Sequence, residues 1–468
     1  MLLLAGCAAG PDFKRPAPPQ VSNYSRTPLT ATTATPGIAG GEAQKFTRGA
    51  DIAGDWWTLF HSRPLDALIR QALAHNHDLK AAQAALKAAH EDALAGRGAR
   101  YPALDAGVAA SRQRDPAATP YNLFTPQLGI SYAPDVFGGA RRAVESLEAQ
   151  ADAVHFQMIA TYTTLASNVV VAAVEEAALR AQIKSTRALL DIGHSMLDTV
   201  KYQASHGYAS NLDVAAQASQ LAQAAATLPD LLQEMAQQRN RLAVLCGQFP
   251  GQAALPVFTL ADLQLPTNLP LSLPSALVAQ RPDVRQAQAA LHAASAAIGV
   301  AAAARLPQIQ LTADAGSTAL AISSVFTSGT GFWGLAATIT APIFHGGELL
   351  HQERAAKATY VQAAEQYRGT VLAAFEDVAD TLAALQQDAE ALKAAAAAAH
   401  AAEVTFQLAQ RQAKVGYASQ LSLLSAQQAW LSTRITLVQA QASRYADTAA
   451  LFQALGGGWW HDKELTTQ

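Results

Sequence analysis

The chain has 468 residues, of which 50% are hydrophobic and 15% are charged, so it has the composition to bury a large core and does not resemble a disordered protein. The formal net charge is −3 and no Lys/Arg cluster is interleaved with aromatic residues, which excludes the usual pattern of a nucleic-acid-binding protein. Alanine dominates long stretches, so we expect long, closely packed helices; no apolar run approaches the roughly 18 residues of a membrane-spanning helix, so any membrane crossing should use strands.

The N-terminus carries the first recognisable signal. Residues 1–6 are predicted to be the remnant of a signal peptide, and Leu4-Ala5-Gly6-Cys7 resembles a bacterial lipobox, in which the cysteine carries the lipid. The alternative is an incidental apolar terminus with a buried free cysteine. Residues 7–54 are rich in Pro, Thr, Ala and Gly, and they are predicted to form a lipidated, extended arm without a core of its own.

A first repeat is predicted over residues 55–264, and it begins with a helix followed by a β-hairpin. An apolar stripe at helical spacing starts at Leu65 and continues towards Gly96, until Pro102 forbids its extension. After that proline the period changes to two, with apolar residues on alternate positions from Leu104. This pattern predicts a hairpin at about 103–134, with one apolar face and strands of a length that suits a membrane barrel.

A long helix and a return helix complete this repeat. After Gly139 the helical pattern continues for roughly 65 residues, on the order of 100 Å. Apolar residues recur every seven positions from Ala151 to Leu179, and again from Leu190 after one eleven-residue step, which predicts a coiled coil. The chain is expected to reverse at a tip turn, residues 205–211. There Ser210 can cap the return helix, and Asp213 gives an acidic version of a capping box.

The same order of elements is written a second time. A Pro-rich connector at 265–274 precedes repeat 2 at 275–458, with a hairpin at about 308–342 and a tip turn at 414–420, and residues 459–468 form a tail. The segment Gly207-Tyr-Ala-Ser-Asn-Leu212 matches Gly416-Tyr-Ala-Ser-Gln-Leu421 at all positions except the fifth.

Four apolar-faced strands per chain cannot close a barrel, and lipid does not tolerate open sheet edges. Several chains must therefore share one barrel. Bacterial barrels begin at about eight strands, so two copies would suffice and three would give about twelve; counting alone does not decide between them.

Several motifs give this duplicated chain a specific resemblance. They are the lipobox-like start with Gly10-Pro11-Asp12-Phe13-Lys14-Arg15-Pro16, the segment Trp56-Trp57-Thr58-Leu59-Phe60, and the helix start Arg281-Pro282-Asp283. Together they resemble the NodT-type lipoprotein branch of the TolC-like outer-membrane factors.

The resemblance implies a fold that is mainly α with a transmembrane β portion: a homotrimer with a twelve-stranded β-barrel continued by a long periplasmic α-helical coiled-coil barrel. It implies an outer-membrane channel subunit of a tripartite efflux system, a passive exit duct for drugs or small solutes that is lipid-anchored at Cys7 in the outer-membrane lipid. The implied partners are a periplasmic membrane-fusion adaptor and an inner-membrane proton-driven exporter.

In that family the tip turns meet the adaptor, which implies a docking role for the two repeated motifs. The residues are Gly207, Tyr208, Ala209, Ser210, Gly416, Tyr417, Ala418 and Ser419. The alternative is that each glycine merely permits the left-handed backbone of a helix-ending turn. We favour both roles together, because the Tyr and Ser are repeated as well.

The periplasmic entrance departs from the family pattern. Members often carry acidic residues just past the second tip turn, but the matching positions here are Ser422 and Ser425, and only Asp213 keeps an acid. We therefore expect hydrogen bonds, or packing of Leu421, Leu423 and Leu424, to close the entrance. For Asp213 a role in the entrance and a purely structural role, as a negative charge near the positive end of the helix dipole, are equally favoured.

No catalytic residue, metal site or cofactor is predicted. The Gly329 to Gly334 segment matches a dinucleotide-binding pattern by letters only, and His75 and His77 are too closely spaced to share a helix face. Two alternatives to the efflux duct remain: an outer-membrane channel of type I protein secretion, and a periplasmic coiled-coil scaffold without a pore.

Overall fold

The computed structural model describes residues 9–26, 29–114, 119–415 and 417–466. The strands are β1 (Lys45–Arg48), β2 (Ala103–Gln113), β3 (Tyr121–Tyr132), β4 (Asn268–Leu271), β5 (Gln308–Ser317) and β6 (Gly331–Thr340). The α-helices are α1 (Arg63–His75), α2 (His77–Gly98), α3 (Gly139–Ser205), α4 (Asn211–Leu245), α5 (Pro274–Gln280), α6 (Pro282–Ala303), α7 (Glu348–Lys414), α8 (Gln420–Ala454) and α9 (Lys463–Thr466). Short 3₁₀ helices are η1 (Trp56–Phe60), η2 (Leu260–Asp262), η3 (Ile322–Ser324) and η4 (Trp459–His461).

The chain divides into two compact units that cut across the sequence repeats. Unit 1 comprises Met1–Ala17, Gln83–Gln157 and Asp283–Thr370, and unit 2 comprises Pro18–Ala82, Met158–Pro282 and Val371–Gln468. Each unit thus draws corresponding segments from both repeats.

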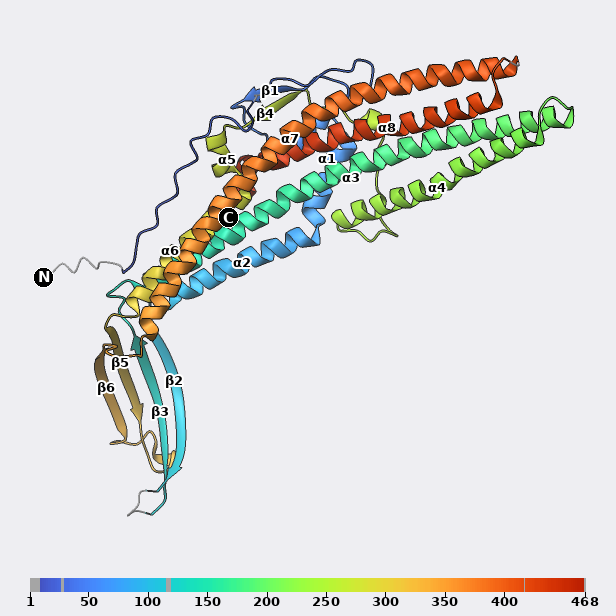
Figure 1. The fold of residues 1–468 in the computed structure, drawn as a ribbon. Helices are drawn as coiled ribbons and strands as arrows, with labels where there is room; N and C mark the ends of the chain where they lie inside the picture. Colours follow the sequence, from blue (N-terminus) through green and yellow to red (C-terminus); the bar gives the residue numbers. More distant parts are fainter. Residues whose placement is uncertain (1–8, 27–28, 115–118, 416, 467–468) are drawn as a thin grey trace. The chain divides into compact units, whose positions relative to one another are not determined.

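Unit 1 contains a four-stranded antiparallel sheet in the order β2-β3-β5-β6 (Figure 1). Both predicted hairpins form, and the central pair β3–β5 joins one hairpin to the other. The register places Leu104 opposite Ile130, Ile130 opposite Ala313, and Ala313 opposite Leu335. Apolar side chains of all four strands therefore share one face of the sheet, as the two-residue period predicts.

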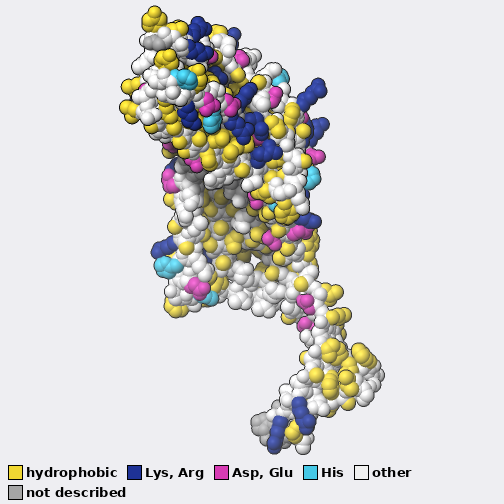
Figure 2. Space-filling view, turned by 90° about the vertical axis from the view of Figure 1, so that its right-hand side faces the viewer, with side chains coloured by type: hydrophobic (Ala, Val, Ile, Leu, Met, Phe, Trp, Pro, Cys, Tyr) yellow, Lys and Arg dark blue, Asp and Glu magenta, His cyan; other side chains and the backbone are white. Residues whose placement is uncertain are grey.

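Large apolar side chains on this face are exposed in the single chain. Val108 is 80% exposed, Leu335 is 75% exposed and Ile339 is 69% exposed. Figure 2 shows hydrophobic side chains gathered over the strands. A contiguous exposed apolar surface of this kind marks contact with lipid or with another chain.

Unit 2 contains α4, α8 and the greater part of α3 and α7, and there the helical hairpins α3–α4 and α7–α8 lie side by side (Figure 1). The seven-residue spacing of a coiled coil is evident in α7, where every seventh side chain is at most 7% exposed. These residues are Val371, Val378, Leu385, Leu392, Ala399 and Phe406. The heptad pattern thus directs one face of the helix into the core of the unit.

The extended arm packs against α8 through a buried polar network. Gln44 Nε2 donates to Thr448 Oγ1 at 2.8 Å, and Arg444 Nη2 donates to Gln44 Oε1 at 2.9 Å. All three side chains are fully buried. These hydrogen bonds offset part of the cost of removing the groups from water, although Arg444 Nε and Nη1 have no partner among the described residues, and they fix where the arm lies on the helix.

Three features differ from the sequence expectations. The first predicted helix is broken at Asn76, whose Oδ1 accepts from Leu79 N–H at 2.9 Å and caps α2, while its Nδ2 donates to the Leu245 carbonyl at 3.1 Å. The arm and the connector also pair, because β1 and β4 form a two-stranded parallel sheet.

The third difference concerns apolar helices. One described helix, α3, is long and apolar enough by composition to cross a membrane, so the expectation that no such run exists was wrong. Of its most apolar window, 61% is buried within the chain. This burial is typical of a core helix.

Candidate functional site

The first tip turn, between α3 and α4 in unit 2, ends its helix in a Schellman motif. Tyr208 N–H donates to the Gln203 carbonyl at 2.8 Å, and Gly207 N–H donates to the Ala204 carbonyl at 3.1 Å. Gly207 has φ +77°, and a Cβ added there would meet no atom within 4 Å. The left-handed backbone therefore requires glycine at this position, whereas space does not.

The return helix α4 begins with the predicted capping box. Ser210 Oγ accepts from Asp213 N–H at 3.1 Å, and Ser210 N–H donates to Asp213 Oδ2 at 2.9 Å. The Ser210 hydroxyl also donates to this carboxylate at 2.7 Å. These hydrogen bonds hold the pKa of Asp213 below its ordinary value.

The described residues of the second tip turn repeat one backbone hydrogen bond and the serine cap of the first, without the charge. Tyr417 N–H donates to the Gln412 carbonyl at 2.9 Å, which corresponds to the bond from Tyr208 to Gln203 in the first turn. Gly416 lies outside the described residues. Ser419 Oγ accepts from Ser422 N–H at 3.2 Å and lies 2.8 Å from the Ser422 hydroxyl. Ser422 thus takes the place of Asp213 with a neutral hydroxyl.

Both turns present a tyrosine to solvent. Tyr208 is 83% exposed and Tyr417 is 87% exposed, while Ala209 and Ala418 are half-buried. A bare helix-reversing turn does not need an exposed aromatic side chain. The two tyrosines are therefore free to contact another molecule.

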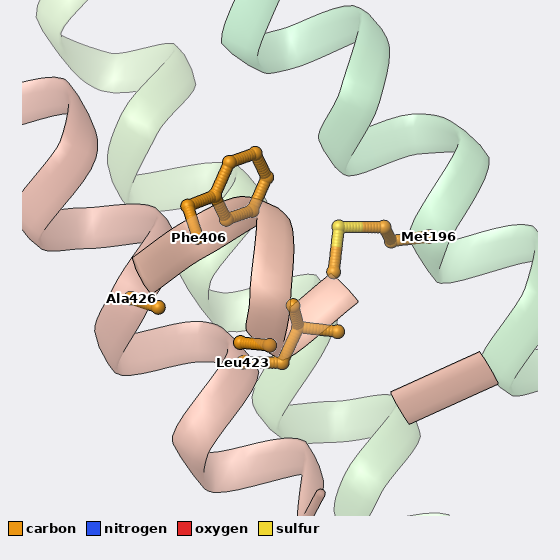
Figure 3. Packing of buried hydrophobic residues seen from close by; sticks show 5 residues of the cluster. Met196, Phe406, Leu423 and Ala426 are labelled. Atoms are coloured by element: carbon orange, nitrogen blue, oxygen red, sulfur yellow. The ribbon is translucent and has the colours of Figure 1, made fainter. Parts of the chain in front are cut away.

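The leucines after the second turn have different environments. Leu421 is 73% exposed, whereas Leu423 is 5% exposed and Leu424 is 8% exposed. Leu423 packs in a core cluster with Met196 of α3 and Phe406 of α7 (Figure 3). Of the three leucines expected to close an entrance, Leu423 and Leu424 are committed to packing within the chain, and Leu421 remains available together with the exposed Ser422 and Ser425.

A buried amide contact behind the turns escaped the sequence analysis. Gln420 Nε2 donates to Gln217 Oε1 at 2.9 Å, and Gln217 is fully buried. This bond joins the start of α8 to α4, and so links the two helical hairpins. Gln217 lies on the same stripe as the buried Leu221 and Ala224. A polar residue that interrupts an apolar coil stripe was the signal that could have found it.

A cavity of about 490 Å³ lies next to this cluster, between α3, α7 and α8. Its walls include Met196 and Leu423, together with the polar side chains Asp191, Gln410 and Lys414. Asp191 and Lys414 are exposed, so this cavity opens to the surface close to the tip turns.

The remaining candidates do not form a chemical site. His75 and His77 are exposed and flank the break between α1 and α2, and within the described residues no cluster of three or more His, Cys, Asp or Glu side chains could hold a metal ion. Gly329 and Gly331 lie in the loop and at the start of β6, and a strand rather than a helix follows them. Cys246 is buried, and Cys7 lies outside the described residues.

Comparison with known proteins identifies the duplicated pattern. The profile described as "Outer membrane efflux protein" matches residues 68–248 and 273–457, one match in each repeat. This chain belongs to the outer membrane efflux protein family. It is thus an outer-membrane component of an efflux system, and its family is one of transport conduits rather than enzymes.

Full-length relatives agree with this assignment. The probable efflux pump outer membrane protein TtgC of Pseudomonas putida is 31% identical over 476 residues, covering 100% of this chain and 96% of that protein. The pyoverdine export outer membrane protein OpmQ of Pseudomonas aeruginosa is 31% identical, covering 87% of this chain and 88% of that protein. The cation efflux system protein CusC of Escherichia coli is 28% identical, covering 98% of this chain and 97% of that protein.

Solved structures share the fold. The outer-membrane channel OprN has a TM-score of 0.85 at 26% identity, covering 97% of this chain and 100% of that chain. The open state of the MtrE outer membrane channel of Neisseria gonorrhoeae has a TM-score of 0.82 at 26% identity, covering 97% of this chain and 99% of that chain. The expected TolC-like fold, with its helical hairpins and membrane strands, is thereby confirmed.

Proposed function

We propose that three copies of this chain form a passive exit duct for drugs or small solutes. The observation that carries the proposal is the four-stranded sheet, which has an exposed apolar face and ends at the edge strands β2 and β6. Lipid does not tolerate unpaired edges, so β2 of one copy pairs with β6 of the next, and three copies give about twelve strands. The helical hairpins form the periplasmic barrel.

Mild detergent extraction followed by mass measurement tests this assembly. We expect the mass of a trimer. In a separate transport assay, cells that lack the gene should accumulate a fluorescent efflux substrate, and complementation should reverse this accumulation. A monomer under mild conditions would contradict the shared barrel. Relatives named for the efflux of antibiotics, toluene or cations, and for pyoverdine export, support small-molecule cargo over type I protein secretion.

The proposed lipid anchor at Cys7 is supported by the residues that follow it. Gly10 has φ +86°, and a Cβ there would lie 2.4 Å from the Gly299 Cα, so the arm contacts α6 backbone to backbone. Asp12 Oδ1 accepts from Arg142 Nη2 at 2.5 Å. The arm is therefore held against α3 and α6 at Gly10 and Asp12, close in sequence to the proposed lipidation site. Cys7→Ala should abolish incorporation of radiolabelled palmitate, and retained labelling would place the lipid elsewhere.

The tip turns are proposed to dock a periplasmic membrane-fusion adaptor, which connects the duct to an inner-membrane proton-driven exporter. The repeated and exposed Tyr208 and Tyr417 support this role, since the turn geometry alone would not require them. Ala209, Ser210, Ala418 and Ser419 complete the docking surface. The adaptor hairpin would contact both turns of each chain.

Paired substitutions separate docking from backbone strain. Gly207→Ala and Gly207→Arg both force a left-handed residue, at a cost of about 1–2 kcal/mol, but only arginine adds bulk and charge outside the turn. We expect Gly207→Arg to abolish efflux in an assembled trimer and Gly207→Ala to retain most of it; the equivalent pair at Gly416 should behave alike. If alanine and arginine have equal effects, the glycine serves the backbone alone.

The entrance is proposed to close through Leu421 packing between copies and through hydroxyl contacts of Ser422 and Ser425, with Asp213 as its remaining acid. Support comes from the exposure of Leu421 and from the neutral Ser419–Ser422 contact. Leu421→Ala should raise the passive conductance of the trimer in planar bilayers. An unchanged closed-state conductance would remove Leu421 from the gate.

A further inference from the structure

A second, unassigned cavity lies in unit 1, where the arm meets α3 and α6. Its volume is about 350 Å³. Two arginines, Arg15 of the arm and Arg285 of α6, line it together with Phe13, Phe156 and His292. Asp152 is the one carboxylate among the described residues that line it. The cavity thus combines two guanidinium groups with aromatic walls.

The arm is held firmly beside this cavity. The Phe13 ring stacks on His292, with centroids 4.3 Å apart and planes inclined by 17°. His292 Nε2 lies 2.9 Å from Glu145 Oε1, and Glu145 also accepts from Arg142 at 2.7 Å. His292 and Glu145 are thus already paired, and Phe13, two residues before Arg15, is held in place by its contact with His292.

Arg285 is also preorganised, but it forms no close ion pair within the described residues. Its Cζ lies 4.8 Å from the centroid of the Phe156 ring, a cation–π arrangement that orients the guanidinium plane. Among the described residues neither Arg285 nor Arg15 has a carboxylate within 4.0 Å, and the buried Arg285 Nε has no acceptor. Elsewhere in this unit Arg97 and Arg142 each hold a carboxylate.

Two like charges therefore face this cavity, Arg285 half-buried and Arg15 exposed. Burial, and after it the charge of Arg15, lowers the pKa of Arg285 from its ordinary value. Arginine nevertheless stays protonated at neutral pH, so a bound anion, and not loss of a proton, would relieve the repulsion between the two guanidinium groups. Asp152 offsets one of the two charges, and one positive charge remains.

We propose that this cavity binds a phosphate-bearing anion, with Arg15 and Arg285 donating to its oxygens. Planar guanidinium groups match phosphate oxygens in a bidentate manner, and two of them converge here. The volume exceeds that of a bare ion and leaves room for an attached organic group against Phe13 and Phe156. A free phosphate compound and a phospholipid headgroup share this chemistry.

Calorimetric titration of the intact, detergent-solubilised protein with inorganic phosphate tests the proposal. We expect saturable binding that Arg15→Gln and Arg285→Gln each weaken by about tenfold or more. Lys14→Gln is the matched control, because it removes one charge from the same arm at a residue outside the cavity. Asp152→Asn should strengthen binding, since it removes the one opposing charge.

Two further measurements keep the result interpretable. Arg285→Lys preserves the charge but not the planar fork, so it should fold and still bind more weakly. Competition by dihexanoyl phosphatidylglycerol would identify a lipid headgroup as the source of the phosphate, and its absence would identify a free phosphate compound. The proposal is overturned if phosphate up to about 20 mM shows no saturation, or if Lys14→Gln weakens binding as much as Arg15→Gln.

Discussion

Replacement of Phe406 by alanine should loosen the end of the α7–α8 hairpin. Phe406 is 5% exposed, and its ring stacks on Trp430 with centroids 5.5 Å apart. Truncation of a buried Phe costs about 3–5 kcal/mol, and we expect about 3–4 because the neighbouring cavity gives the cluster room to collapse. With a factor of ten for every 1.4 kcal/mol, amide hydrogens around residues 400–430 should exchange about 10²- to 10³-fold faster.

Hydrogen exchange followed by mass spectrometry on the assembled protein measures this directly. Leu408→Ala is the matched control, since Leu408 lies two residues further along α7 and is 49% exposed. Its loss should cost less than about 0.5 kcal/mol and change exchange only slightly. The reasoning is refuted if Phe406→Ala accelerates exchange by less than about tenfold, or if both variants act alike.

Three further predictions concern other parts of the chain. Glu176 is fully buried and pairs with Arg180 at 2.5 Å and with Arg239 at 2.8 Å. Glu176→Gln should lower the free energy of unfolding by about 2–4 kcal/mol, less than for a fully buried pair because both arginines are 32% exposed. An unchanged midpoint of chemical unfolding would refute this. Burial, then a hydrogen bond with Asp447, raises the pKa of Asp388 to about 7. A carboxyl with a raised pKa stabilises the folded state at low pH, and this stabilisation is lost as the pH rises through 7. Asp388→Asn should therefore remove the fall in thermal midpoint with rising pH. If the midpoint of the variant still falls, Asp388 does not cause the fall. Leu335→Arg on the apolar face should reduce the stability of the protein in the membrane by about 2–4 kcal/mol per chain and deplete it from outer-membrane fractions. Ala336→Arg on the opposite face should not deplete it. Equal depletion of both variants would contradict the assignment of the two faces.

Local periodicity explains why so much of the fold was predictable. A two-residue period can only bury one face of a strand, and a seven-residue period can only bury one face of a coil, so the hairpins and long helices follow from their own segments. The capping box of Ser210 and Asp213 is equally local. The tip turns were found for the same reason, since their repeated motif is contiguous.

Features that depend on distant partners were not predictable in this way. The break at Asn76 is stabilised by the Leu245 carbonyl, and β1 pairs with a strand more than 200 residues away. The difference between exposed Leu421 and buried Leu423 depends on which helices cover α8. Neither their residue type nor their spacing distinguishes them, because the partner face comes from α3 and α7.

The two tip turns share a backbone hydrogen bond and a serine cap but differ in charge at one position, a carboxylate at Asp213 and a hydroxyl at Ser422. The internal repeat permits this difference, because each turn is a separate stretch of sequence and can differ from the other within the same chain. In the proposed trimer, charged and neutral turns would alternate around the ring. A partner that contacts the ring would then meet two inequivalent classes of binding site, and could bind one class with higher affinity than the other.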